Sequence, residues 1–360
     1  MPFRATQQRP TQRQIAAQVG VSVTTVSRIL NPAETSPERW ASPETVAAIQ
    51  QAAASMGYRR NALAVSLRTS RSQTVGVLMP FMGEYVLAAI YTGIDEAARE
   101  HGMMAINAAT LDEPALRSER TFTMLDHLVD GMIFADAHLD EHFLDELDDQ
   151  GVPFTLVHRS HERFVSVCAD EKAAGRMAAQ HLIGLGRRRL AVISGRPFMS
   201  TSAGRVGGFV EATLEAGLPR PTVIEAGYEV AAGRDAGYTM MTHPPYPDGI
   251  FAIHDLAALG VMSVMRQHGL SIPDDVAVIG FYDTPMALAT DLTSIGTCLQ
   301  HMGRRSLELL LDRLDGKSVE SEVCPVTLKV RRSTDPSVPI ANDTAARTMG
   351  GTTPLPASPE

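Results

Sequence analysis

Two series of short apolar runs, separated by helical patterns, constrain the fold of this 360-residue chain more than any other feature. The first series is VGVLM at 75–79, MMAINAA at 103–109, GMIFA at 131–135 and VPFTLV at 152–157. The second is LAVIS at 190–194, TVIEA at 222–226, GIFAI at 249–253 and VAVIG at 276–280. Continuous apolar strands are typical of parallel sheets buried on both faces, and segments such as DEKAAGRMAAQHLIGLG have the pattern of crossover helices. The sequence therefore predicts two α/β units of similar size.

Three short helices are predicted ahead of these units. Thr11 and Gln14 have the spacing of a capping box, and Ser42, followed by a proline, predicts the start of the third helix. Between them, Ser22 can cap a second helix after the turn at Gly20. Two short helices joined by a glycine-containing turn form the helix-turn-helix pattern.

The second helix carries short side chains and one arginine on its outer face. Its apolar positions at 26, 29 and 30 share the side that is predicted to be buried. In a helix-turn-helix the second helix enters the major groove, where an arginine can form two hydrogen bonds with a guanine. Taken by itself, the pattern also fits an ordinary α-hairpin. The outward residues are Val23, Thr24, Ser27 and Arg28.

Charge is distributed unevenly along the chain, whose net charge is −9. Residues 1–72 contain nine arginines, no lysine and three glutamates, so the negative excess lies entirely in the remainder. A basic N-terminal segment joined to an acidic body indicates that only the first part approaches a polyanion. A basic tail that merely aids solubility is the alternative.

Several classes of protein are disfavoured by composition and motifs. The first 25 residues lack a signal pattern and no run of 18 apolar residues occurs, which predicts a soluble, cytoplasmic chain. Three cysteines without CxxC spacing argue against a disulfide framework or a zinc site. The segment ADAHLDEH (Asp136, His138, Asp140 and His142) could chelate a metal, but we interpret it as a solvated face. No GxSxG, P-loop or HExxH motif is present, so we expect neither enzymatic activity nor a cofactor.

Three stretches of the first 80 residues occur in an order that is specific to one family. They are QIAAQVGVSVTTVSRILN at 14–31, SPETVAAIQQAAASMGYRRNALAVSLRT at 42–69 and TVGVLMP at 74–80. Through these residues the chain resembles the lac repressor family of bacterial transcription regulators. The resemblance continues to about Thr334 through DGMIFA, GVPFTLVHR, HLIGLGRRRLAVISG, RVGGF, IFAIHDLAALG, IPDDVAVIGFYDTP, LTSIG and VTLKVRRST.

The resemblance implies a hinge helix at 61–67 that folds on operator DNA, with Leu67 wedged into the minor groove. A seven-residue helix is too short to be stable alone, so folding coupled to DNA binding is physically reasonable. A passive amphipathic linker is the alternative. The DNA-binding residues that we predict are Ser22, Val23, Thr24, Thr25, Ser27, Arg28, Asn31, Tyr58, Asn61, Ala64 and Leu67.

The resemblance also implies an effector site between the two α/β units, at the carboxyl ends of the strands. Arg205 and Asp255 match the ligand-binding arginine and aspartate of the family, and such a pair suits the vicinal hydroxyls of a sugar. For the other candidates, a packing role is the alternative. The predicted effector-binding residues are Phe81, Glu84, Tyr85, Phe198, Thr201, Arg205, His254, Asp255 and Tyr282.

Four features depart from the family pattern. The loop PAETSPERWA at 32–41 is longer than is usual and contains the only tryptophan, Trp40. This insertion either adds a contact with DNA or a partner or touches nothing, and we expect the second. Arg60 replaces a common proline, His254 a common asparagine, and Tyr282 a common aspartate. The last two changes lie near the expected cleft and so affect the choice of ligand.

These observations predict a small all-α helix-turn-helix domain followed by a two-lobed α/β domain that resembles periplasmic binding proteins. The expected boundaries are a headpiece at 1–60, a hinge and linker at 61–72, an effector-binding and dimerisation domain at 73–335, and a disordered tail at 336–360. Lobe one is expected at about 73–169 and 299–324, and lobe two at about 170–298 and 325–335.

The predicted function is transcriptional repression, controlled by a small effector, most simply a sugar or sugar acid. The expected partners are a pseudo-palindromic double-stranded operator and a second copy of the chain, as a homodimer or a dimer of dimers. Two other classes were weighed. A small-solute-binding protein predicts an export signal and lacks a DNA-reading helix, whereas a non-specific architectural DNA binder would discriminate little between sequences.

Overall fold

The computed structural model describes residues 10–30, 36–58, 71–127, 129–139, 142–242 and 244–339. Its contacts divide the chain into two compact units, Met1–Ser72 and Gln73–Glu360. Among the described residues, no helix is both long enough and apolar enough to cross a membrane. The predicted hinge at 61–67 and the tail beyond residue 339 lie outside the described residues.

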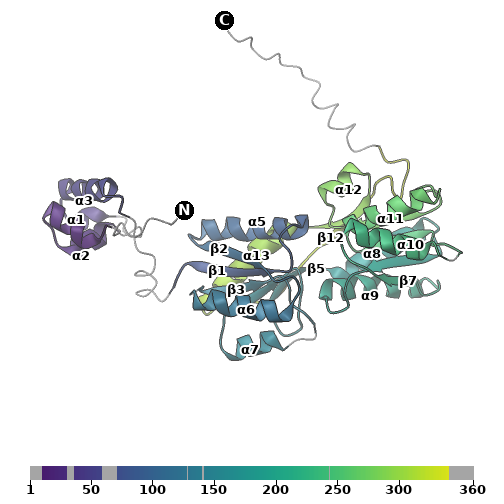
Figure 1. Cartoon of the computed structure of the whole chain (residues 1–360), viewed down its shortest axis with the longest axis horizontal. Helices are drawn as coiled ribbons and strands as arrows, with labels where there is room; N and C mark the ends of the chain where they lie inside the picture. The colour runs from purple at the N-terminus through teal and green to yellow at the C-terminus, as the bar shows by residue number, and fades with distance from the viewer. Residues whose placement is uncertain are drawn as a thin grey trace, which may run out of the picture. The chain divides into compact units, whose positions relative to one another are not determined.

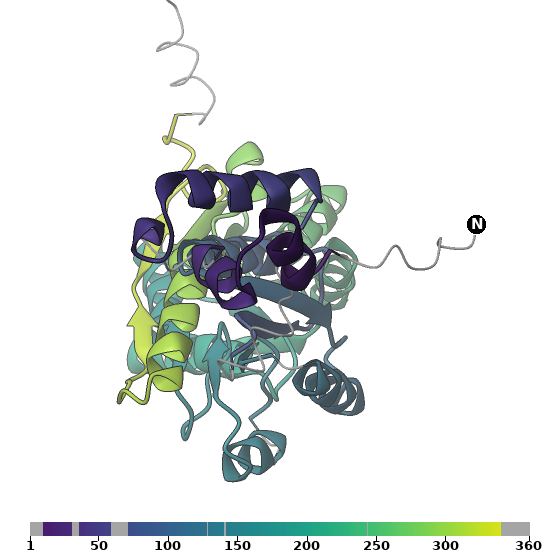
Figure 2. The ribbon, with the colours of Figure 1, turned by 90° about the vertical axis from the view of Figure 1, so that its left-hand side faces the viewer.

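The first unit is a group of short helices, drawn in purple in Figure 2. The predicted caps are confirmed: the side chains of Thr11, Ser22 and Ser42 each accept a hydrogen bond from the backbone N–H three residues later. Gly20 ends the first helix with a φ of 75°, a conformation that glycine adopts without strain. The elements are α1 (Gln12–Val19), α2 (Val23–Ile29), the 3-10 helix η1 (Pro37–Arg39) and α3 (Pro43–Ser55).

A small apolar core holds these helices together. Ile15 from α1, Val26 from α2 and Ile49 from α3 are completely buried in it. Burial of an aliphatic side chain contributes roughly 1.5–3 kcal/mol, so three such anchors account for much of the stability of so small a unit. The core fixes which face of α2 remains outside.

Lobe one is built on a six-stranded sheet in the order β11-β5-β4-β3-β1-β2, and its strand pairs are parallel. α5 and α13 cover one face, while α6 and α7 pack on the other (Figure 1). The strands are β1 (Thr74–Met79), β2 (Met104–Ala109), β3 (Gly131–Phe134), β4 (Phe154–Val157), β5 (Ser166–Ala169) and β11 (Glu322–Cys324). The helices are α5 (Tyr85–Glu100), α6 (Pro114–Asp126), α7 (Phe143–Asp149) and α13 (Leu299–Leu314).

Lobe two repeats this plan with the order β12-β10-β9-β8-β6-β7, in which only the β10–β12 pair is antiparallel. α8 and α9 pack on one face, and α10 and α11 on the other. The strands are β6 (Leu190–Ser194), β7 (Thr222–Glu225), β8 (Gly249–Ala252), β9 (Ala277–Phe281), β10 (Thr293–Thr297) and β12 (Val326–Lys329). The helices are α8 (Glu171–Gly184), α9 (Ser200–Glu215), α10 (Val230–Met240), α11 (Asp255–Gln267) and α12 (Pro285–Ala289).

The chain passes between the two sheets three times. The crossovers run from β5 to α8, from β10 to α13 and from β11 to β12. Near the second crossover, α5 and α13 approach so closely that a Cβ on Gly93 or Gly303 would lie 1.9 Å from a backbone oxygen of the other helix. The start of α13 is therefore held firmly against lobe one.

The predicted fold class is confirmed, with an N-terminal helix-turn-helix unit and two lobes with parallel sheets. The eight apolar runs each overlap an observed strand. The four remaining strands, β5, β10, β11 and β12, have weaker apolar runs, and β11 and β12 lie at sheet edges.

Candidate DNA-binding and interlobe sites

The outer face of α2 exposes the side chains that could reach a base. Val23 is 42% exposed, and Thr24 and Arg28 are exposed as well. Ser22 and Thr25 are engaged with each other, because the Ser22 Oγ accepts from the Thr25 backbone N–H at 3.0 Å and lies 2.8 Å from its hydroxyl. The two hydroxyls therefore hold the start of α2.

Trp40 contacts the recognition helix. The Cζ of Arg28 lies 3.8 Å from the centroid of the Trp40 ring, a distance typical of a cation–π contact. The expectation that the inserted loop touches nothing is therefore wrong. The Trp40 ring, near the end of this loop, packs on Arg28, the residue that is predicted to contact a base.

The other predicted DNA-binding residues fall into two groups. Tyr58 and Ser27 are half-buried, and Tyr58 packs against the small core of the first unit. The rest, and Arg60, lie outside the described residues: Asn31, Asn61, Ala64 and Leu67.

A contact between the lobes joins two predicted effector-binding residues, Glu84 and His254. Glu84, at the N-cap of α5 in lobe one, lies with its Oε1 2.6 Å from the Nε2 of His254 in lobe two. The His254 Nδ1 accepts from the backbone N–H of Leu256 at 3.1 Å, so the Nε2 carries the proton that faces Glu84. The imidazole is 2% exposed.

Arg205 and Tyr282 form the next part of the same cluster. The Arg205 Nη2 donates to the Tyr282 hydroxyl at 2.7 Å, and its guanidinium lies over the ring of Phe281 at 3.7 Å. Tyr282 in turn has its hydroxyl 3.5 Å from the Nε2 of His158, a residue of lobe one. Burial, together with the positive charges of Arg205 and Arg159, lowers the pKa of His158 well below its usual value. A neutral His158 can accept a hydrogen bond from the Tyr282 hydroxyl.

Glu171 is a site residue that the sequence interpretation missed. Its carboxylate receives hydrogen bonds from the Nε and Nη2 of Arg205, and Arg205 Nη1 donates to the Ile253 carbonyl at 2.8 Å. Burial opposes the charged form of Arg205, but the Glu171 carboxylate raises the pKa of the guanidinium. Glu171 lies within the predicted helix DEKAAG, where an acidic residue in the first turn gives no signal of a role beyond capping.

Asp255 is occupied by bonds within lobe two. Its Oδ1 accepts from the Ser294 hydroxyl at 2.6 Å and its Oδ2 from the Thr284 backbone N–H at 2.8 Å. The side chain is fully buried at the start of α11. In this structure Asp255 ties three segments of lobe two together rather than presenting free oxygens.

The lobes also touch through Phe198, another predicted residue. Its ring stacks on His138 of lobe one with 4.1 Å between centroids, and its carbonyl accepts from the Leu139 N–H at 3.0 Å. Beside it, Arg159 donates to both oxygens of Asp112 at 2.7 and 2.8 Å. Burial opposes ionisation of this carboxyl, but contacts with His138 and Arg159 lower the pKa of Asp112 to about 2.

A pocket of about 670 Å³ opens between the lobes next to these contacts. Phe81 and Asp112 line it from lobe one, and Arg196, Phe198 and Tyr228 line it from lobe two. The pocket combines aromatic faces with ionised groups. Such a surface suits a ligand with both C–H faces and hydroxyls.

Asp136 and His138 are not part of a solvated face, so that interpretation is wrong for them. Asp136 is fully buried and accepts from the Thr110 hydroxyl at 2.5 Å, while its backbone carbonyl accepts from Arg117 at 2.6 Å. His138 is 7% exposed, whereas the side chain of His142 is 90% exposed. Asp140 lies outside the described residues.

Of the nine predicted effector-binding residues, only Phe81 and Phe198 line this pocket. Thr201 is buried in the first turn of α9, and Tyr85, at the first position of α5, is 52% exposed. Tyr85 lines a second pocket with Tyr282. The structure thus gathers Glu84, Arg205, His254 and Tyr282 into one cluster and adds partners that lacked a motif, namely Asp112, His138, His158, Arg159, Glu171 and Tyr228.

Known proteins with similar sequences are transcription regulators. Residues 11–61 match the description "Bacterial regulatory proteins, lacI family", and residues 179–334 match a periplasmic binding protein-like domain. The HTH-type transcriptional regulator CelR of Thermobifida fusca is 32% identical over 326 residues, which cover 87% of this chain and 94% of that protein. Catabolite control protein A of Priestia megaterium is 29% identical over 331 residues, covering 89% and 98%.

Solved structures show the same architecture. A transcriptional regulator CelR–cellobiose complex is 30% identical with a TM-score of 0.68, and the match covers 90% of this chain and all of that one. The lac repressor dimer bound to operator and the anti-inducer ONPF has a TM-score of 0.83 at 22% identity over 91% of this chain and 99% of that one, a likeness of fold.

The helix-turn-helix unit and the two-lobed unit together define a DNA-binding regulator under effector control. The chain belongs to the lacI family of bacterial regulatory proteins.

Proposed function

We propose that this chain represses transcription by binding a pseudo-palindromic operator as a homodimer, and that a sugar or sugar acid bound between the lobes controls its DNA affinity. In this proposal residues 1–60 read DNA, 61–72 form the hinge, and 73–335 bind the effector and dimerise. The observation that carries the effector part is the direct contact between Glu84 of lobe one and His254 of lobe two.

The outer face of α2 supports sequence-specific binding. Val23 and Thr24 are short enough to let the helix sit deep in the major groove, and Arg28 can donate two bonds to one guanine. The Ser22 cap holds the amino-terminal end of α2, the end that faces base edges in this motif. Operator DNA is therefore the partner that the geometry favours.

The chemistry of the interlobe cluster supports a polyhydroxylated effector. Glu84 is an acceptor and Tyr282 is both a donor and an acceptor, while Tyr228 and Phe198 offer aromatic faces. A sugar has hydroxyls that can bond to the polar groups and C–H faces that can pack on the aromatic rings. The solved CelR structure has cellobiose as its ligand, which makes a β-linked disaccharide the first compound to test.

A ligand in this cleft would act by replacing direct contacts between the lobes. Inserting a sugar between Glu84 and His254 exchanges one direct lobe-to-lobe contact for bonds through the ligand, and this favours a different lobe orientation. The two hinges of a dimer would then change their separation, and operator affinity would change by the coupling free energy, typically about 1–3 kcal/mol.

The experiment is a ligand screen on the full chain by thermal unfolding, followed by operator binding with each hit. The set contains cellobiose, lactose, glucose, gluconate and hypoxanthine. We expect a sugar or sugar acid to raise the unfolding temperature and to change operator affinity about 5- to 150-fold. His254→Ala should lose both responses, whereas His142→Ala, at an exposed histidine that does not line the interlobe pocket, should keep them. Stabilisation by the purine alone would contradict the proposed effector class.

A further inference from the structure

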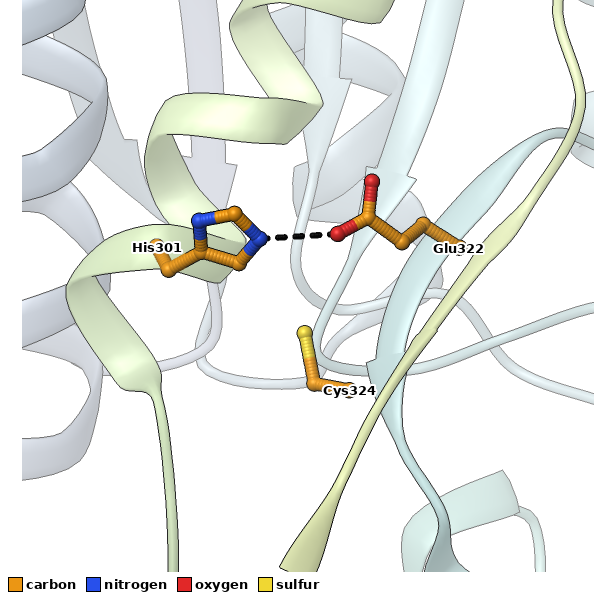
Figure 3. Close-up of side chains that lie close together, drawn as sticks. All are labelled: His301, Glu322 and Cys324. Carbon is orange, nitrogen blue, oxygen red and sulfur yellow. Dashed lines mark hydrogen bonds and ion pairs between the residues drawn. The ribbon is translucent and has the colours of Figure 1, made fainter.

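We propose that His301, Glu322, Cys324 and Cys298 form a binding site for a Zn²⁺-class metal ion beside two of the crossovers between the lobes. One ligand atom each from His301, Glu322 and Cys324 lies within 4.8 Å of the other two. Figure 3 shows the three side chains pointing toward one another from α13 and β11. Imidazole, carboxylate and thiolate are the three ligand types that Zn²⁺ binds in proteins.

The spacing of the four residues fits a metal site with two ligands from each of two elements. Cys298 is the N-cap of α13 and His301 lies in its first turn, a CxxH pair that shares one side of the helix. Glu322 and Cys324 are alternate residues of β11, so both face the same side of the strand. Neither pair has the CxxC spacing that is typical of zinc sites, so the sequence pattern gave no signal of them.

The Cys298 thiol neighbours the Cys324 thiol and is the fourth ligand in this proposal, although it lies outside the set of atoms within 4.8 Å of one another. Cys298 and Cys324 are both free cysteines, so each can coordinate a metal as the thiolate. Coordination forms the metal–sulfur bond as the proton leaves for solvent, so affinity should rise with pH. No electron transfer is involved.

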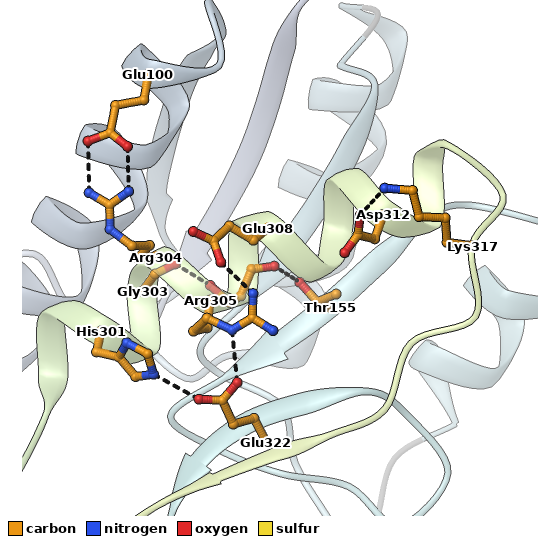
Figure 4. Close-up of polar contacts among 11 residues, drawn as sticks. Glu100, Thr155, His301, Gly303, Arg304, Arg305, Glu308, Asp312, Lys317 and Glu322 are labelled. Carbon is orange, nitrogen blue, oxygen red and sulfur yellow. Dashed lines mark hydrogen bonds and ion pairs between the residues drawn. The ribbon is translucent and has the colours of Figure 1, made fainter.

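Arg305 orients the Glu322 carboxylate through an ion pair. Its Nε donates to the Glu322 Oε2 at 2.8 Å, while the Oε1 lies 2.8 Å from the His301 Nε2 (Figure 4). The ion pair with Arg305 leaves the Glu322 carboxylate oriented toward His301. An outer partner that orients a ligand in this way is a regular feature of metal sites.

An entry path reaches these residues from solvent. Cys298 and His301 line a pocket that also includes Pro325, the first residue after β11. Cys324, which precedes Pro325 in the chain, is buried, with 1% of its surface exposed. The chain enters lobe one at α13 and leaves it after β11. An ion that joins these two elements would therefore resist movement of the two crossovers.

The test is titration of the reduced, chelator-treated full chain with Co²⁺. We expect one Co²⁺ per chain with a thiolate-to-cobalt charge-transfer absorption, displacement by Zn²⁺, and a metal-dependent rise in unfolding temperature. His301→Gln and Cys324→Ser should abolish the absorption. Arg305→Gln should weaken binding about 10- to 100-fold.

Cys168→Ser is the matched control, because Cys168 lies on β5, the strand next to β11, but outside the set. It should bind Co²⁺ as the wild type does. Cys298→Ser, at an exposed position, should bind more weakly and lose part of the charge-transfer intensity. Absence of the absorption at stoichiometric Co²⁺, or its survival in Cys324→Ser, would overturn the proposal. These readouts do not involve DNA or sugar, so they stand apart from the proposed function.

Discussion

The indole of Trp40 lies against the guanidinium of Arg28, with 3.8 Å between the Cζ and the ring centroid. A stacked guanidinium keeps its N–H donors free in its own plane, where they can still meet a base edge. The stack also limits the rotamers of a long, exposed side chain, so less conformational entropy would be lost if Arg28 binds DNA as proposed. In that proposal the inserted loop preorganises the side chain that contacts the base.

Replacing Trp40 should therefore weaken specific DNA binding. We expect Trp40→Ala to lower operator affinity about two- to fivefold, because a cation–π contact at an exposed site contributes about 0.5–1 kcal/mol. Trp40→Phe should keep most of the affinity, since it retains an aromatic face. Competition binding against operator and random duplexes measures both. Equal affinities for wild type and Trp40→Ala would show that the stack does not assist binding.

Arg28 itself should carry sequence preference. Arg28→Ala is expected to cost about 1–3 kcal/mol on the preferred operator and to relax the preference at one position of each half-site. The measurement is the affinity for a set of operators with single base changes. Uniform loss on every sequence would make Arg28 a phosphate ligand instead.

Arg205→Ala should destabilise the protein as well as the effector site. The substitution leaves the Glu171 carboxylate buried without its partner, a change that costs about 3–5 kcal/mol. The double variant Arg205→Met with Glu171→Leu removes both charges and should recover much of that loss. Urea unfolding of the three proteins compares them. A single variant as stable as the wild type would mean that the pair is not buried as described. Effector binding is better probed with Tyr282→Phe, which removes one hydroxyl.

His158 should make stability fall at mildly acidic pH. Its pKa is lowered by burial in the folded protein, so below about pH 6.5 the unfolded chain binds a proton that the folded chain does not. The resulting loss is at most about 1.4 kcal/mol for each pH unit below that value. His158→Asn tolerates the φ of 70° at this position and should lose less stability between pH 7.5 and 5.5. The measurement is the free energy of unfolding in urea at both pH values for the wild type and His158→Asn. An identical loss of stability in the two proteins would mean that another group causes the effect.

Much of the fold follows from short-range patterns. Thr11, Ser22 and Ser42 start helices where their side chains can cap them. Each apolar run became a strand, and these strands are buried except for the edge strands β2 and β7, which are largely exposed or half-buried. These signals are local, because a cap needs a partner three residues away and a buried strand needs only its own side chains. Strand β11 lacked such a signal, since its burial comes from Cys324 alone and it pairs only with β5.

The candidate site was only partly predictable, because its polar groups are brought together by tertiary packing and do not follow a regular spacing in the sequence. Glu84 and His254 lie at the carboxyl ends of predicted strands and could be selected as neighbours of a cleft. Glu171 and Arg159 have no motif, and their roles follow from the buried partners that tertiary packing brings to them. The contact of Trp40 with Arg28 was also not predictable, because the length of the loop does not indicate where its side chains lie.

Selection of bound sequences from a random duplex pool by the full chain, followed by competition binding of the selected site with and without the sugar identified by unfolding, tests the central claim most directly. The account predicts a pseudo-palindromic site held on the order of 10³-fold or more tighter than random DNA, with the ratio changed by the sugar in the wild type but not in His254→Ala. Recovery of no common sequence, or a specific site whose affinity is the same at every sugar concentration, would contradict it.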